Sequence, residues 1–262
     1  MKHLLTTSLV GIMLTLGSAS GMAHSNDLVC DADLAYNIDV KNNELSFSTQ
    51  GQQKVLILGK GSTPAQELYL DGNKQALNAE QQTLLKEYNQ QIRQLLPQAA
   101  AVANEASAIA VDAVASVTSA LLHDNPDKAK EFTAKVEKLS AGLSQHISQN
   151  HLRPEGVVEY IESSNFEAEF EALVESAVAD FMENNVGEIV AAALSGNEDK
   201  VKAFEQRMEK FGQEMEQQFE ARGEVLEKQA EKLCQLVQSI DLTEGELVKA
   251  FAKFDEYQLI TE

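Results

Sequence analysis

The stretch that says most about the fold runs from Val201 to Ile240 and reads VKAFEQRMEKFGQEMEQQFEARGEVLEKQAEKLCQLVQSI. Apolar side chains recur in it every three or four residues, which is the spacing of one face of an α-helix. Glutamate, lysine and arginine fill the opposite face. The pattern predicts a helix of about 60 Å, at 1.5 Å per residue, with the character of a coiled-coil arm.

The first half of that apolar face combines phenylalanine with methionine. We call these five side chains the Phe/Met seam: Phe204, Met208, Phe211, Met215 and Phe219. Methionine and phenylalanine together form adaptable apolar surfaces that suit variable partners. A seam at this spacing is more often buried against neighbouring helices. The sequence therefore leaves two interpretations open, a helix core and a partner-binding groove.

Helical patterns also occupy the chain between residue 78 and this stretch. Asn78 and Gln81 form a capping box, and Pro97 is expected to kink or end the helix that follows. An alanine-rich helical segment runs from Ala99 to Leu122. Further helix starts are expected at Asn125–Pro126 and at Ser164, where Glu167 completes a second capping box. Other boundaries are a break at Arg153–Pro154, a weak point at Gly187, a C-cap at Ser195–Gly196, and a short terminal helix capped by Thr243 and Glu246.

The segment from residue 34 to residue 71 has the alternation of half-buried strands instead. Turn residues with a tolerance for positive φ separate its parts. The apolar segments are Leu34–Val40, Leu45 with Phe47, Val55–Leu58, and Leu68 with Leu70, and the turns are Lys41–Asn43 and Asp71–Asn73. The pattern predicts three or four antiparallel strands.

These patterns define an α+β protein that is mostly α. A small N-terminal antiparallel β-meander, residues 24–75, precedes a bundle of long amphipathic helices, residues 76–262, and we expect the two to form one compact unit. Residues 1–23 have the charged start, the apolar run and the small residues of a cleavable signal peptide. The protein is therefore expected outside the cytoplasm.

Composition narrows the class of partner. The formal net charge is −20, and such a surface repels nucleic-acid phosphates and anionic membranes. No stretch after residue 23 is expected to insert into a membrane, because Asn104, Glu105 and Asp112 interrupt the alanine-rich segment.

Two cysteines, Cys30 and Cys234, are the only ones in the chain. In an oxidising compartment an even count indicates a disulfide. The predicted Cys30–Cys234 bridge would join the first mature segment to the last long helix. Two separate free thiols are the alternative.

No motif in the sequence indicates catalysis, and we expect no cofactor and no metal. His146 and His151 are five residues apart, which does not match the i,i+4 pair of a zinc helix. Asp71–Gly72–Asn73 begins like a calcium loop but lacks the later ligands. Gly59–Lys60–Gly61–Ser62 lacks the spacing of a phosphate-binding loop.

The chain as a whole resembles the YggN-like family of periplasmic proteins of Gram-negative bacteria. The likeness rests on the signal peptide, on Cys30 followed by the Leu34–Val40 strand, on the glutamate-rich late helix with Leu233–Cys234, and on the terminus with Phe254–Asp255 and Leu259–Ile260. The resemblance implies a periplasmic location and no activity.

Three hypotheses about function follow. The leading one is a non-enzymatic interaction protein, chaperone-like, that uses its long amphipathic helices. The second is an enzyme or small-ligand carrier with a pocket between sheet and helices. The third is a structural or self-assembling protein of the cell envelope.

Overall fold

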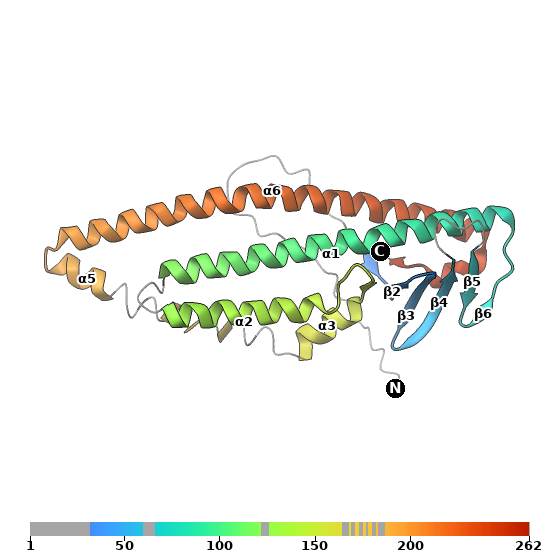
Figure 1. The fold of residues 1–262 in the computed structure, drawn as a ribbon, viewed down its shortest axis with the longest axis horizontal. Coiled ribbons are helices and arrows are strands. Elements are labelled where there is room, and N and C mark those ends of the chain that lie inside the picture. The colour runs from blue at the N-terminus through green and yellow to red at the C-terminus, as the bar shows by residue number, and fades with distance from the viewer. Residues whose placement is uncertain are drawn as a thin grey trace, which may run out of the picture. The chain divides into compact units, whose positions relative to one another are not determined.

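The fold is that of a computed structural model (Figure 1). It describes residues 32–59, 66–121, 126–163, 168, 171–172, 175–176, 178–179, 182 and 187–261. The predicted signal peptide, Cys30 and the predicted helix start at Ser164 lie outside these residues.

The chain divides into two compact units. The first, which we call the sheet unit, comprises residues 1–99, 148–158 and 231–262, and the second, the helical unit, comprises residues 100–147 and 159–230. The boundary between the units falls inside three helices, so the long helices α1 and α6 and the short helix at residues 154–163 contribute residues to both.

The sheet unit contains an antiparallel sheet of six strands, in the spatial order β6-β5-β4-β3-β2-β7. Five of them follow one another along the chain as a meander, which confirms the predicted N-terminal strands. The strands are β2 (Asn37–Lys41), β3 (Glu44–Thr49), β4 (Gln52–Leu58), β5 (Glu67–Leu70), β6 (Asn73–Lys74) and β7 (His151–Leu152). The sixth strand, β7, was not predicted, and it pairs with Ile38 and Asp39 of β2.

A second, two-stranded sheet joins the two ends of the described chain. In it β1 (Asp33–Leu34) pairs antiparallel with β8 (Ile260–Thr261). The predicted Leu34–Val40 strand is therefore two strands, because Ala35 and Tyr36 separate β1 from β2.

The helix α1 (Ala79–Leu121) begins where the sequence predicts. The Asn78 side-chain oxygen accepts a hydrogen bond from the Gln81 N–H, and the Gln81 side-chain oxygen accepts one from the Asn78 N–H, each at 2.9 Å. Pro97 lies inside the helix and does not end it. Leu96 and Ala100, on either side of it, are buried, and their packing offsets the backbone hydrogen bond that proline removes.

Three shorter helices with defined bounds follow α1 in the described part of the chain. Among them α2 (Pro126–Ser144) starts at the predicted proline, whereas α3 (Pro154–Ser163) starts where only a break was expected. Gly187 begins α5 (Gly187–Leu194) instead of weakening the middle of a helix. The C-cap after α5 is confirmed, since Gly196 has a φ of 73° and the Asn197 N–H donates to the Ala192 carbonyl.

The last long helix, α6 (Glu198–Ala250), has 53 residues and is longer than predicted. The prediction of a separate terminal helix capped by Thr243 and Glu246 is wrong. The Thr243 hydroxyl donates instead to the Ser239 carbonyl one turn earlier, so it lies within a continuous helix. The chain then forms the 3₁₀-helix η2 (Ala252–Tyr257) and β8.

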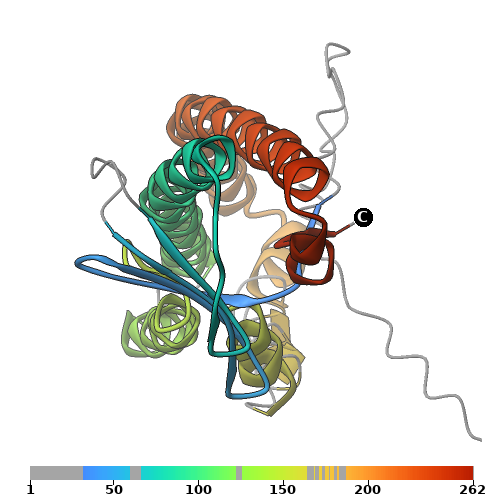
Figure 2. The same ribbon diagram turned by 90° about the vertical axis from the view of Figure 1, so that its right-hand side faces the viewer.

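The core of the sheet unit lies between the six-stranded sheet, the first part of α1 and the last part of α6 (Figure 2). An aromatic series crosses it: the Phe47 and Tyr88 ring centroids are 6.1 Å apart, and those of Tyr88 and Phe254 are 5.8 Å apart. The largest fully buried side chains of the described residues all belong to this unit: Tyr88, Phe47, Phe254, Ile38, Leu45, Ile57, Leu68, Leu85, Ile92, Leu95, Leu96 and Ile240.

The helical unit packs more loosely. Phe132 and Val136 of α2 form a small buried cluster with Val111 and Val114 of α1. Arg222 of α6 donates to Glu105 at 3.0 Å and to Asp112 at 2.5 Å, both on α1. The carboxylates that interrupt the alanine-rich segment are therefore paired with a guanidinium.

By length and composition alone, α1 meets the criteria for a membrane-crossing helix over Ala79–Ser119. The expectation that no stretch after residue 23 is apolar enough to cross a membrane is wrong for α1 by these criteria, because alanine and valine outweigh its few charged residues. A packed helix in an aqueous protein meets the same criteria.

Candidate functional site

The Phe/Met seam lies on the part of α6 that belongs to the helical unit. All five of its side chains are half-buried, and none reaches the fully buried state of Ile240 or Leu247 further along the same helix. The apolar face of α6 is thus covered unevenly: it enters a closed core at its C-terminal end and is only partly covered between residues 204 and 219.

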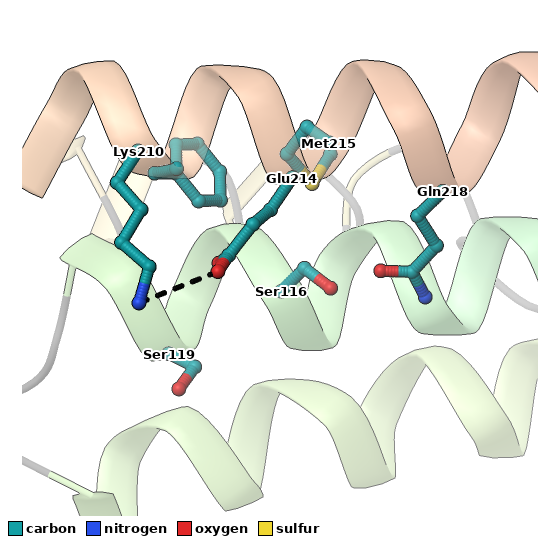
Figure 3. Close-up of a pocket in the computed structure, with 7 residues that line it drawn as sticks. Ser116, Ser119, Lys210, Glu214, Met215 and Gln218 are labelled. Carbon is teal, nitrogen blue, oxygen red and sulfur yellow. Dashed lines mark ion pairs between the residues drawn. The ribbon is translucent and has the colours of Figure 1, made fainter.

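A partly open hollow of about 380 Å³ lies beside the middle of the seam. Phe211 and Met215 supply its apolar lining, and Ser116 and Ser119 of α1 lie opposite. Figure 3 shows the side chains of Met215 and Gln218 extending from α6 toward Ser116. Small serine side chains on α1 leave the space that larger residues would fill.

The rim of this hollow is polar and charged. The Lys210 ammonium lies 3.5 Å from the Glu214 carboxylate, one turn later on α6 (Figure 3), and both side chains are exposed. An exposed pair of this kind contributes little to stability. It does place both signs of charge next to an apolar floor, an arrangement that suits an amphipathic ligand.

A second hollow, of about 360 Å³, lies between α1 and α2 in the same unit. Its lining consists mostly of small side chains: Ser107, Ala108, Ser140, Ala141 and Ser144. Neither hollow has a sheet residue in its lining.

The hollow beside the seam offers polar groups and an apolar floor to a ligand. The hollow is lined by hydroxyl, amide, ammonium and carboxylate groups, but its lining contains no histidine or cysteine. In the described part of the chain, no three His, Cys, Asp or Glu side chains gather to hold a metal ion. His146 instead packs against the Tyr160 ring at 6.1 Å, and His151 Nδ1 lies 2.9 Å from the Ser148 hydroxyl.

Cys234 lies on α6 within the sheet unit and is 8% exposed. Its predicted partner, Cys30, precedes the described residues. Ala32, two residues after Cys30, and Leu233 both pack against the core of the sheet unit. The Cys30–Cys234 bridge stays a prediction.

One buried carboxylate, that of Glu244, was not predicted from the sequence. Glu244 is fully buried and accepts hydrogen bonds from the Tyr88 hydroxyl, from the Leu259 N–H at 2.6 Å and from the Ile260 N–H at 3.0 Å. Burial raises its pKa, while the three donors oppose that rise. Packing closes this carboxylate from solvent, so its role is to fasten the C-terminal segment to α1 and α6.

Comparison with known proteins places the chain in a family. A family model described as "Protein of unknown function (DUF2884)" matches residues 30–260. No curated protein and no solved structure matches the chain. The match covers most of the chain, including both units and the Phe/Met seam, and the chain therefore belongs to the DUF2884 family of proteins of unknown function.

Proposed function

We propose that the protein is a non-enzymatic interaction protein, chaperone-like, that holds apolar segments of other polypeptides against the Phe/Met seam. The observation that carries the proposal is the uneven cover of α6. Five large apolar side chains stay half-buried along it, and two of them, Phe211 and Met215, line a hollow with a charged rim. Flexible methionine and planar phenylalanine adapt to varied apolar side chains, and the rim gives the flanking backbone polar partners.

The proposed place of action is the periplasm, reached through the signal peptide at residues 1–23. The family match begins at residue 30, after that segment, and the resemblance to the YggN-like family points the same way. The predicted Cys30–Cys234 bridge fits an oxidising compartment. The ion pairs of Arg222 with Glu105 and Asp112 favour α1 as a packed helix rather than a membrane span.

A small-ligand carrier is the second candidate. The hollow beside Phe211 has a volume of about 380 Å³, which falls in the range of small-molecule sites. Its place would be the helical unit rather than the junction of sheet and helices.

The test is suppression of aggregation by the mature chain. Thermally denatured citrate synthase is followed by light scattering with wild type, with the double variant Phe211→Ser/Met215→Ser, and with the control Val225→Ser/Leu242→Ser. Val225 and Leu242 are exposed apolar residues of the same helix that lie outside the seam. Wild type and control should slow aggregation, and the seam variant should lose most of that effect.

Failure of wild type to slow aggregation would overturn the chaperone proposal, as would full activity of the seam variant. Native mass spectrometry of protein purified from the periplasm then tests the carrier. A small molecule bound to wild type and absent from the seam variant would establish that alternative.

A further inference from the structure

One half-buried arginine of the sheet unit has no carboxylate partner among the described residues. The structure describes the side chains of three arginines, and two of them, Arg153 and Arg222, are each paired with carboxylates. Arg93 of α1 instead donates hydrogen bonds to two neutral acceptors, and none of the ion pairs between described residues includes it. The chain has 41 aspartates and glutamates against 21 lysines and arginines, so an arginine without one is unusual here.

Neutral groups of the sheet unit fix the orientation of the Arg93 guanidinium. Its Nε donates to the Asn89 side-chain oxygen at 2.8 Å, and its Nη2 donates to the Glu44 carbonyl at 3.2 Å. Asn89 is fully buried and is held in turn, because its amide donates to the Gly59 carbonyl at 2.9 Å and to the Gln66 side-chain oxygen at 2.7 Å. A guanidinium has five N–H donors. Its Nη1 amino group has no acceptor among the described residues and is left for a ligand.

The chain around Arg93 keeps carboxylates away from it. Glu44 offers its carbonyl, whereas its side chain leaves the core face of β3, because side chains alternate along a strand and the next residue, Leu45, lies in the core. Residues 60–65, between Gly59 and Gln66, include no aspartate or glutamate. The neighbours one turn away on α1 are also uncharged, namely Asn89, Gln90, Leu96 and Pro97.

This arrangement has a cost that a ligand can offset. Burial disfavours a charged group that lacks an opposite charge, and it lowers the pKa of Arg93. The planar N–H fork of a guanidinium matches the two oxygens of a carboxylate, and Arg153 and Arg222 bind carboxylates in this same protein. A net charge of −20 disfavours a phosphate dianion more than a singly charged carboxylate. We propose that Arg93 binds the carboxylate group of a ligand through its Nη1 amino group.

This site belongs to the sheet unit, whereas the Phe/Met seam belongs to the helical unit. The inference therefore goes beyond the proposed function and does not depend on it.

The first experiment follows the arginine side-chain Nε–H signals of the isotope-labelled mature chain by NMR. Sodium acetate replaces sodium chloride at constant ionic strength, so a general salt effect is removed. The Arg93 signal, identified by its loss in Arg93→Lys, should shift and reach saturation, while the Arg153 signal should not. An Arg93 signal that does not shift, or a shift without saturation, would overturn the inference without reference to any variant.

The second experiment compares variants by saturation transfer from the folded protein to the acetate methyl group. Arg93→Lys keeps the charge and loses the fork, so it should weaken acetate binding about tenfold. Arg93→Gln should abolish binding, and the matched control Arg153→Gln should bind as wild type does. Circular dichroism checks that each variant is folded. Unchanged binding by Arg93→Gln would overturn the inference and leave Arg93 with the role of joining α1 to the turn before β3.

Competition then distinguishes the source of the carboxylate. Displacement of acetate by an alanine tripeptide with a free C-terminal carboxylate, and not by the same peptide with a C-terminal amide, would support a polypeptide ligand. Displacement by succinate and by neither peptide would support a small carboxylic acid. Tighter binding of inorganic phosphate than of any carboxylate would overturn the proposed ligand class.

Discussion

The sheet unit and the helical unit use apolar side chains in opposite ways. In the sheet unit a sheet, two helix ends and η2 enclose Phe47, Tyr88 and Phe254 without exposure. In the helical unit the apolar side chains are mostly half-buried, and its buried cluster centres on Phe132 and Val136. The same helix, α6, supplies both kinds of environment along one apolar face.

The difference indicates where the stability of the fold resides and where the proposed binding takes place. Free energy of folding comes from apolar area removed from water, so the sheet unit has the larger share. Half-buried phenylalanine and methionine contribute less to folding, and they keep area available for a partner. Unfolding in urea together with hydrogen exchange resolved by mass spectrometry tests this division, because exchange reports the two units separately.

The largest effect concerns the predicted disulfide. Cys234 belongs to the sheet unit, and closing a loop of some 200 residues stabilises by up to about 5 kcal/mol in the chain-entropy model. Non-reducing peptide mapping should find the Cys30–Cys234 pair. Reductant should lower protection mainly in the sheet unit, and Cys30→Ser/Cys234→Ser should be insensitive to reductant. Two thiols that alkylate without reduction would contradict the bridge.

Core truncation gives the next largest effect. Phe47→Ala should lower the free energy of unfolding by about 4 kcal/mol, because it opens a cavity in a closed core. Phe211→Ala, the matched change in the seam, should cost about 1 kcal/mol, since its ring stays partly exposed to water and its loss opens no closed cavity. Equal losses of unfolding free energy in urea for the two variants would contradict the division between the units.

Glu244 allows the same kind of test for a buried polar side chain. Glu244→Leu should cost about 3 kcal/mol, because the Tyr88 hydroxyl and the N–H groups of Leu259 and Ile260 lose their acceptor in a buried site. Exchange should rise first at residues 259–261. An unchanged exchange rate there would show that the carboxylate does not fasten the C-terminal strand.

The same residue predicts a pH effect. Burial raises the pKa of Glu244 above its ordinary value of 4.5, so the folded state binds this proton more tightly than the unfolded chain does. Its contribution to stability is therefore fully present below about pH 4 and is lost as pH rises through the folded pKa. As pH rises through this range, wild type should lose unfolding free energy relative to Glu244→Gln. A gain by wild type would contradict the raised pKa of Glu244.

A smaller effect than those in the sheet unit is expected where α2 packs against α3. A Cβ on Gly142 of α2 would overlap the Tyr160 ring of α3, so Gly142→Ala should cost about 2 kcal/mol through displaced packing. Gly212→Ala on α6 is the control, because its Cβ would meet no neighbour. Exchange should rise in α2 and at residues 159–163 of α3 and stay unchanged in the sheet unit.

Local signals in the sequence predicted the local structure. Alternation predicted β2 to β5, and the Asn78–Gln81 box predicted the start of α1, because both depend on neighbouring residues alone. Pro97 does not end the helix, because its effect does not depend on neighbouring residues alone. It removes a backbone hydrogen bond, but Leu96 and Ala100 pack in a core that only the folded chain forms.

Long-range pairing lay beyond sequence reasoning. Nothing local distinguishes His151–Leu152 as a strand, since its partners lie more than a hundred residues earlier in β2. Glu244 sits in the acidic run DLTEGE, where a solvated carboxylate is the ordinary expectation. For the seam, helical spacing predicted the apolar face of α6. The degree of burial depends on how many elements cover that face at each point along the helix.

The pairing of β1 with β8 has a consequence for how the protein is made. Asp33 meets Thr261 and Leu34 meets Ile260, so the first and last strands of the described chain close on each other. A ribosome makes the N-terminal part of a chain first. The sheet unit therefore completes its fold only after β8 has been synthesised, and until then its N-terminal strands lack their final partner.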